Sequence, residues 1–130
     1  MNLEERNEYV AYRINKANET FEVAELLISN QKWNSAINRL YYAAYYAVTA
    51  LLVSEKIITK THSGVKTQFF LKFIKTRLID KELGKVYSDL FDWRQKGDYG
   101  DFFDFSEEDV KSIYLPTRKL INVISGILNE

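Results

Sequence analysis

The segment 94–101 holds the residues whose types and spacing are best suited to chemistry. It reads Arg-Gln-Lys-Gly-Asp-Tyr-Gly-Asp, so an arginine is followed by a phenol and two carboxylates in a glycine-containing stretch. Arg94 lies on the same helical stripe as Tyr87 and Leu90, because these positions are three and four residues apart. We therefore expect Arg94 to point into a contact rather than into water.

Two uses of this segment remain open from the residues alone. In the first, the guanidinium of Arg94 holds a phosphate, while Asp98 and Tyr99 lie beside the reacting group. In the second, Asp98 or Asp101 neutralises an arginine, either Arg94 or Arg39. The cluster would then only pin the loop to the protein, since buried charges need partners.

Composition and motifs exclude several other kinds of site. The chain contains no cysteine, which removes disulfides, zinc clusters and thiol catalysis. It has no pair of Glu-x-x-His motifs, no Walker loop, no Gly-x-Gly-x-x-Gly and no His-Glu-x-x-His. The single histidine, His62, is interpreted as a capping or surface residue, because no acid–base partner stands near it in sequence. We predict no metal and no cofactor.

The elements that must position these residues are helices. The stretch 34–55 opens with a candidate cap, Asn34 or Ser35, contains no Gly or Pro, and carries two adjoining apolar stripes. Such a helix is buried by several neighbours rather than lying on a surface. We predict that it is the central helix of an α-bundle, in which alanines let neighbours approach and tyrosines fill the gaps: Tyr41, Tyr42, Tyr45 and Tyr46.

Helical periodicity also predicts the remaining elements. These helices are expected over about 3–29, from Thr61 or Ser63 to Arg77 or Leu78, from Asp80 to Gly97, and from Ser106 to Leu128. Gly97 and Gly100 should break the fourth helix and leave 98–105 as a loop. Pro116 should kink or split the last helix. Because no strand pattern is present, we predict a single all-α domain spanning 1–130.

Charge is unevenly spread, although the formal net charge is +0. Residues 56–96 hold ten Lys/Arg and four Asp/Glu, whereas residues 97–114 hold six acids and one lysine. These are either solvated faces whose charges pair in three dimensions or a basic face for phosphates beside an acidic loop. The acidic start is unlike a secretory signal, and the longest apolar run is too short for a bilayer. We predict a cytoplasmic protein without membrane contact.

Two blocks of the sequence carry a resemblance to a known family. They are Ser35–Ala47, with Ile-Asn-Arg-Leu-Tyr-Tyr at its centre, and Leu90–Asp101, with Trp-Arg-Gln-Lys-Gly-Asp-Tyr. Together they resemble the HEPN (higher eukaryotes and prokaryotes nucleotide-binding) domain, and Lys60–Val65 fits its small stand-alone prokaryotic members. The resemblance implies an antiparallel up-and-down bundle of four main helices plus a shorter one. It also implies a homodimer, encoded beside a nucleotidyltransferase partner as a toxin–antitoxin pair.

The resemblance includes a catalytic signature from which this chain departs. Many members of the resembled family are metal-independent ribonucleases with an arginine, four to six residues, and then a histidine. Arg94 matches the arginine, but Tyr99 stands where the histidine would be. A tyrosine with pKa near 10 is roughly a thousandfold less available as a base at pH 7 than a histidine. Asp98 would serve as base only if burial raised its pKa.

The leading hypothesis is a HEPN-type module of a two-component system, dimeric, that binds RNA or nucleotide phosphate through an Arg94–Tyr99 cleft. One alternative is a metal-independent endoribonuclease toxin with a degenerate Arg-x4-Tyr motif, and another is a purely structural dimerisation module. The candidate catalytic residues are Arg94, Tyr99 and Asp98, and the candidate binding residues are Arg39, Arg94, Lys96 and Asp101. We expect three loop aromatics at the subunit contact: Tyr99, Phe102 and Phe103.

Overall fold

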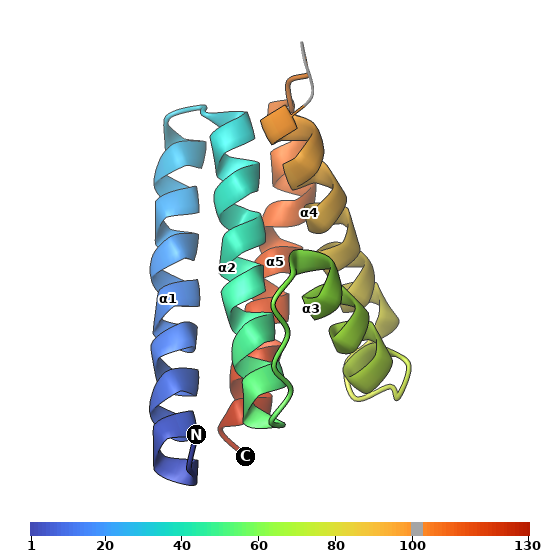
Figure 1. Cartoon of the computed structure of the whole chain (residues 1–130). Helices are drawn as coiled ribbons and strands as arrows, with labels where there is room; N and C mark the ends of the chain where they lie inside the picture. The colour runs from blue at the N-terminus through green and yellow to red at the C-terminus, as the bar shows by residue number, and fades with distance from the viewer. Residues whose placement is uncertain (100–102) are drawn as a thin grey trace.

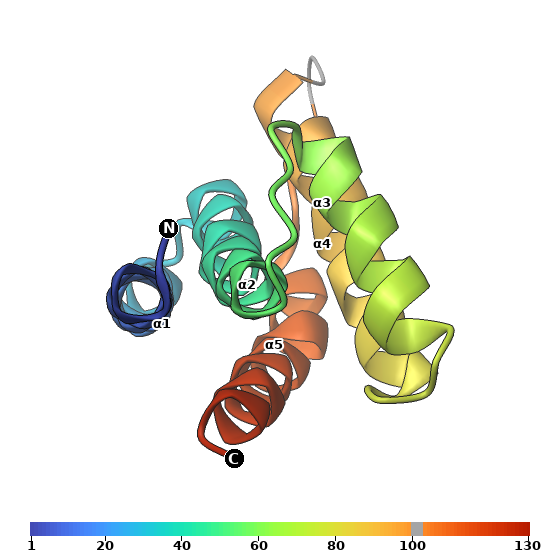
Figure 2. The same cartoon turned by 60° about the horizontal axis from the view of Figure 1, so that its bottom comes forward.

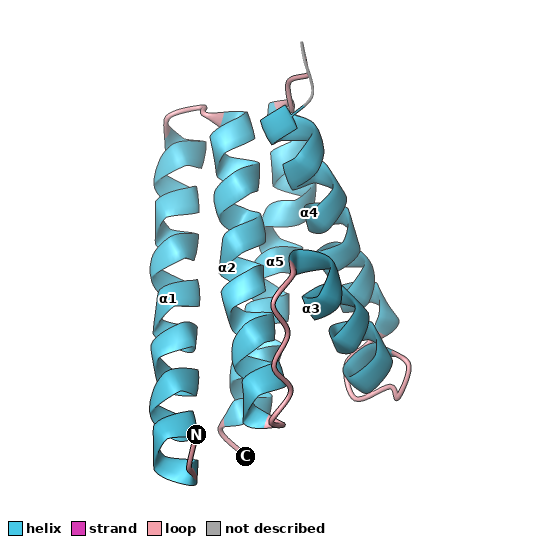
Figure 3. Ribbon diagram, in the orientation of Figure 1, coloured by secondary structure: helices cyan, strands magenta, loops and turns pink. Residues whose placement is uncertain are grey.

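The computed structural model describes residues 1–99 and 103–130, except for the side chain of Tyr99, and all regular structure in these residues is helical (Figure 3). The elements are α1 (Leu3–Ser29), α2 (Trp33–Ser54), α3 (His62–Phe69), the π-helical η1 (Phe70–Ile74), α4 (Lys81–Tyr99) and α5 (Glu107–Leu128). The four long helices run alternately up and down, and the short α3 lies beside α4 (Figure 1). The predicted all-α bundle is confirmed. Among the described residues, no helix is both long and apolar enough to span a bilayer.

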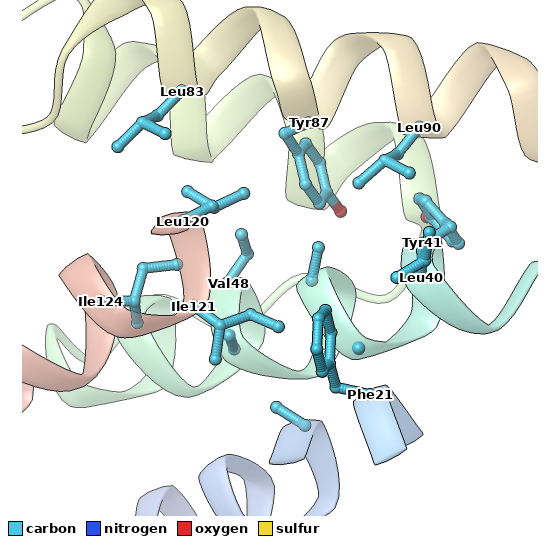
Figure 4. Packing of buried hydrophobic residues seen from close by; sticks show 14 of the residues in the cluster. Phe21, Leu40, Tyr41, Val48, Leu83, Tyr87, Leu90, Leu120, Ile121 and Ile124 are labelled. Atoms are coloured by element: carbon cyan, nitrogen blue, oxygen red, sulfur yellow. The ribbon is translucent and has the colours of Figure 1, made fainter. Parts of the chain in front are cut away.

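The centre of the bundle is α2, as the sequence predicts. It packs against α1, α3, α4 and α5, and these neighbours surround it in the turned view (Figure 2). Side chains from three of the neighbours converge on α2, among them Phe21 of α1, Tyr87 of α4 and Ile121 of α5 (Figure 4). The close approach is possible because alanines occupy much of the buried surface of the helix: Ala36, Ala43, Ala44, Ala47 and Ala50.

The predicted cap of α2 is wrong, and the reason is tertiary. The helix begins at Trp33, one residue before Asn34, and its cap position is occupied by Lys32 without a side-chain hydrogen bond. The Asn34 side chain instead accepts a hydrogen bond from the Phe105 backbone N–H at 2.7 Å and donates to the Phe103 carbonyl at 3.0 Å. Asn34 therefore ties the segment that leads into α5 to the beginning of α2.

The predicted break at Gly97 is also wrong, because α4 continues to Tyr99. A Cβ atom at position 97 would lie 3.0 Å from the ring of Phe105, so the glycine allows a close approach within the bundle. Asp98 and the backbone of Tyr99 are therefore helical rather than part of a loop. Gly100 and Asp101, which we also predicted to be loop, lie outside the described residues.

The third helix ends earlier than predicted, because η1 ends at Ile74 and not at Arg77 or Leu78. The starts of α3 and α5 follow the sequence signals. Thr61 caps α3, since its hydroxyl accepts a hydrogen bond from the Gly64 backbone N–H at 2.9 Å. Ser106 and Asp109 form the predicted capping box of α5. This helix runs without interruption through Pro116, so the proline does not split it. One missing backbone donor is evidently tolerated in a helix whose apolar side is buried against the bundle.

We predict that Asn34→Ala lowers the free energy of unfolding by about 1 to 2 kcal/mol, because it leaves the partly buried Phe105 N–H without its acceptor. Urea unfolding followed by circular dichroism measures the change. The matched control is Asn122→Ala, since Asn122 is exposed on α5. Equal stability of the two variants would contradict the tertiary role of Asn34.

Candidate functional site

Arg94 lies half-buried on α4 and is held by two tyrosines of α2. Its Nη1 donates a hydrogen bond to the Tyr42 hydroxyl at 3.0 Å. Its Cζ lies 5.1 Å from the ring centroid of Tyr41 and 5.7 Å from that of Tyr42, so the cation faces both rings. The Nε atom is buried and finds no hydrogen-bond partner among the described residues. The expectation that Arg94 points into a contact is confirmed.

No carboxylate of the described residues neutralises Arg94. The ion pairs found there are Lys85–Asp89 and Lys111–Glu107, and each joins neighbouring turns of one helix. Asp98 therefore does not pair with Arg94, while Asp101 lies outside the described residues. Aromatic rings and a phenol oxygen stabilise a guanidinium without cancelling its charge. The site keeps a positive field into which an anion can bind.

A second set of polar side chains, Arg39, Asn38 and Asp98, joins the start of α2 to the end of α4. The Arg39 guanidinium donates to the Asn38 amide oxygen at 2.9 and 2.7 Å. The Asn38 amide nitrogen in turn donates to the Asp98 carboxylate at 3.0 and 3.3 Å. These three side chains line a depression of about 490 Å³ together with Gly97. Asn38, which the sequence analysis did not single out, is thus the link between an arginine and a carboxylate.

The structure brings together only some of the predicted site residues. Arg39 and Arg94 both lie near the ring of Tyr42, at 5.0 and 5.7 Å from Cζ to the ring centroid. Lys96 is exposed in the last turn of α4 and makes no hydrogen bond or ion pair with the described residues. Asp98 belongs to the Asn38 group rather than to the surroundings of Arg94. The side chain of Tyr99 is outside what the structure describes.

His62 is the residue that the sequence analysis misjudged. It is the first residue of α3 but not its cap, which is Thr61. Its Nδ1 lies 2.7 Å from the Tyr41 hydroxyl, and its ring centroid lies 4.5 Å from that of Tyr45. The interpretation as a capping or surface residue is therefore wrong. We refer to five side chains as the His62–Arg94 cluster: Tyr41, Tyr42, Tyr45, His62 and Arg94.

The protonation states within this cluster follow from its surroundings. Burial, and secondarily the positive charge of Arg94, lower the pKa of His62 below its ordinary 6.5. Burial raises the pKa of Tyr41 and also that of Tyr45, so both phenols stay protonated at neutral pH. At pH 7 the cluster therefore combines one permanent cation with a neutral imidazole. Such a combination can bind an anion and exchange a proton with it.

Comparison with known proteins agrees with this helical bundle. The family model of the HEPN domain matches residues 10–127, and the chain belongs to that family. A UPF0332 protein of Thermotoga maritima is 36% identical over 128 residues, which cover 98% of this chain and 97% of the relative.

Two relatives from Methanocaldococcus jannaschii carry functional names. The protein named "Putative toxin MJ0142" is 35% identical over 75% of this chain and 67% of its own length. The protein named "Putative toxin MJ0605" is 29% identical over 88% of this chain and 84% of its own length. The chain is thus a HEPN-domain protein that is similar to proteins named as toxins.

We predict that the pKa of His62 lies below 6.5 and rises in Arg94→Gln, because this substitution removes the charge that disfavours the imidazolium. Proton NMR titration measures both values, and assignment is direct since the chain has one histidine. A pKa at or above 6.5 in the unmodified chain would contradict the burial of the imidazole.

The same shift predicts how stability depends on pH. Between the lowered folded-state pKa and about 6.5, the unfolded chain binds more protons at His62 than the folded chain does. The His62 contribution to stability is therefore complete above pH 6.5 and is lost as the pH falls through the folded-state pKa. Thermal melts between pH 5 and 7.5 of the unmodified chain and of His62→Gln isolate this contribution.

Proposed function

We propose that this chain is a toxin-like HEPN module that acts as a homodimer in a two-component system and binds RNA phosphates through Arg94 and Arg39. The observation that carries the proposal is the state of Arg94. Its guanidinium faces two rings and forms an ion pair with no carboxylate of the described residues. Guanidinium groups in this state bind phosphate with charge-assisted hydrogen bonds.

The surroundings of Arg94 favour a polynucleotide over a single nucleotide. Cations from two helices lie against half-buried tyrosines of α2: the Cζ of Arg39, on α2, is 5.0 Å from the Tyr42 centroid, and the Cζ of Arg13, on α1, is 5.4 Å from the Tyr46 centroid. Positions 39 and 46 are about 10 Å apart along a helix that rises about 1.5 Å per residue. Cations interleaved with aromatic rings over such a length suit the backbone of a single strand.

The homodimer is supported by the end of the bundle that carries Arg94. Phe103 keeps 39% of its surface exposed although its ring packs against Phe105 at 4.9 Å between centroids. An exposed phenylalanine that packs on a second aromatic ring is suited to a subunit contact. The Tyr99 side chain and Phe102, which the sequence analysis also expects at this contact, lie outside what the structure describes. A twofold axis there would bring two copies of Arg94 to one cleft.

The two-component part of the proposal rests on the family. The small stand-alone HEPN proteins that this sequence resembles are often encoded beside a minimal nucleotidyltransferase, and two relatives are named as putative toxins. We propose a nucleotidyltransferase-type protein as the partner. A reading frame for such a protein next to the one for this chain supports the pairing, and its absence favours a solitary module.

We predict that Arg94→Ala weakens binding of a single-stranded RNA oligonucleotide and lowers the slope of log K against log salt by about 0.7, the value for one phosphate contact on a single strand. Arg39→Ala should have the same kind of effect. Fluorescence anisotropy at several salt concentrations measures both. Arg77→Ala is the charge-matched control, because Arg77 is exposed in the turn before α4.

The structural alternative predicts a different result for the same variants. If the arginines only hold helices together, Arg94→Ala and Arg39→Ala lower the melting temperature while RNA affinity stays equal to that of Arg77→Ala. That outcome would replace the binding proposal with a purely structural dimerisation module.

We predict that the chain is a dimer at micromolar concentration and that Phe103→Ser shifts it toward the monomer, because the substitution removes apolar area from the proposed contact. Light scattering coupled to size-exclusion chromatography measures the mass. The control is Leu26→Ser, which removes an exposed apolar side chain of α1 outside the proposed contact and should leave the mass unchanged. A monomer in the unmodified chain would contradict the shared cleft.

A further inference from the structure

A polar pocket lies beside the Arg94 site, at the end of the bundle where α2 begins and α4 ends (Figure 1). It is the depression of about 490 Å³ whose wall includes the Arg39 guanidinium and the Asp98 carboxylate, with Leu27 of α1 as an apolar side chain. Ligand pockets of this size accommodate a small planar group. Because Arg39 lies against the Tyr42 ring and Arg94 bonds to the Tyr42 hydroxyl, the pocket adjoins the proposed phosphate site.

The amide of Asn38 holds a donor group and an acceptor group side by side. Its oxygen accepts hydrogen bonds from Nε and Nη2 of Arg39, at 2.9 and 2.7 Å. Its nitrogen donates to the two oxygens of Asp98, at 3.0 and 3.3 Å. The Nη1 atom of Arg39 takes no part in these bonds, and a carboxylate has about four lone-pair positions, of which the amide uses at most two. Arg39 can therefore still donate to a ligand, and Asp98 can still accept from one.

Arg39 and Asp98 suit two different parts of one nucleotide. A guanidinium binds the phosphate. A carboxylate repels a phosphate placed against its oxygens, so Asp98 requires a ligand that presents hydrogen-bond donors. In an RNA strand these donors belong to the base edges and to the ribose 2′-hydroxyl. A cation and a carboxylate held on one amide therefore fit a nucleotide whose phosphate lies on Arg39 and whose donors reach Asp98.

Guanine is the RNA base whose donors match a carboxylate. Its Watson–Crick edge carries two adjacent donors, N1–H and the N2 amino group. Adenine, cytosine and uracil each present one donor group beside an acceptor on that edge, and the ribose of an internal nucleotide offers one hydroxyl. Because both oxygens of a carboxylate only accept, one of them would face an acceptor in each of the other three bases. Asp98 therefore favours guanine over the other bases.

We propose that this pocket selects guanine in a single-stranded RNA, with the Asp98 carboxylate accepting hydrogen bonds from N1–H and from the N2 amino group. The inference rests on the proposed function, because Arg39 and Arg94 hold the phosphates of the same strand. It assigns Asp98 to base recognition instead of the role of catalytic base considered in the sequence analysis. Asp98 is exposed, so it lacks the burial that a carboxylate base requires.

The test measures binding of the purified full chain to labelled uridine oligonucleotides that differ only in their central base. We expect the oligonucleotide with guanine to bind about 10-fold more tightly than those with adenine, cytosine or uracil, which is the order of discrimination that one bidentate pair gives. Hypoxanthine lacks the N2 amino group, so an oligonucleotide with this base should bind with intermediate affinity. Fluorescence anisotropy measures each dissociation constant.

Asp98→Asn tests the carboxylate itself. The substitution keeps the size of the side chain and an acceptor for Asn38, but it replaces one acceptor by a donor. The ratio of the affinities for guanine and uracil should therefore fall to about one. The control is Asp92→Asn, which removes an equal charge at an exposed position of α4 and should keep the ratio. A general gain in RNA affinity from the lost negative charge is common to both variants, and circular dichroism melts confirm that both are folded.

The outcomes separate this inference from the proposed function. Equal affinity for the four bases, or a preference for a base other than guanine, overturns the inference and leaves phosphate binding by Arg94 and Arg39 in place. A preference for guanine that survives in Asp98→Asn also overturns it, because another group then recognises the base. Failure of the unmodified chain to bind any of the oligonucleotides overturns the proposed function as well.

Discussion

The positive charge of Arg94 is stabilised by tyrosine side chains rather than by a carboxylate. This contact joins α4 to the central helix, α2. A half-buried guanidinium needs hydrogen-bond acceptors and polarisable neighbours. Tyr42 supplies the acceptor and Tyr41 supplies a ring face. Because both tyrosines lie on α2, the contact fixes α4 against the central helix. The remaining hydroxyl, that of Tyr41, is then left to hold His62 at the start of α3.

The part of this arrangement that depends on local periodicity could be predicted from the sequence. Two apolar stripes identify α2 as the central helix, and the spacing of Arg94 from Leu90 and Tyr87 places it in a contact. His62 could not be placed in the same way, because its partner Tyr41 stands 21 residues earlier and a connection of irregular structure lies between them. Because the chain has a single histidine, no spacing between histidines could indicate a site. Its only local signal is the Thr61 cap, which makes His62 the first residue of a helix.

Two polar or glycine positions were misinterpreted because a tertiary contact overrides the local preference. Asn34 has the residue type of a helix cap, but its amide satisfies backbone groups 69 and 71 residues later in the chain. Gly97 has the residue type of a helix break, but the ring of Phe105 occupies the space where a side chain would be. Both positions contact the same segment, residues 103–105, which leads into α5. Local sequence rules assign Asn34 to a cap and Gly97 to a helix break. Phe105 overrides both assignments, because its backbone N–H bonds to Asn34 and its ring packs against Gly97.

The charge state of the cluster also suggests how phosphate binding would change the pKa of His62 in the proposed complex. In the free protein, burial and the charge of Arg94 together hold the pKa of His62 below its usual value. A phosphate bound to Arg94 would cancel much of that charge and add a negative one nearby, and both changes favour the imidazolium. The imidazole would thus become a stronger base only once a phosphodiester is in place. Because Arg94 and His62 come from different helices joined through Tyr41, this coupling would depend on the packing of α2 rather than on a short motif.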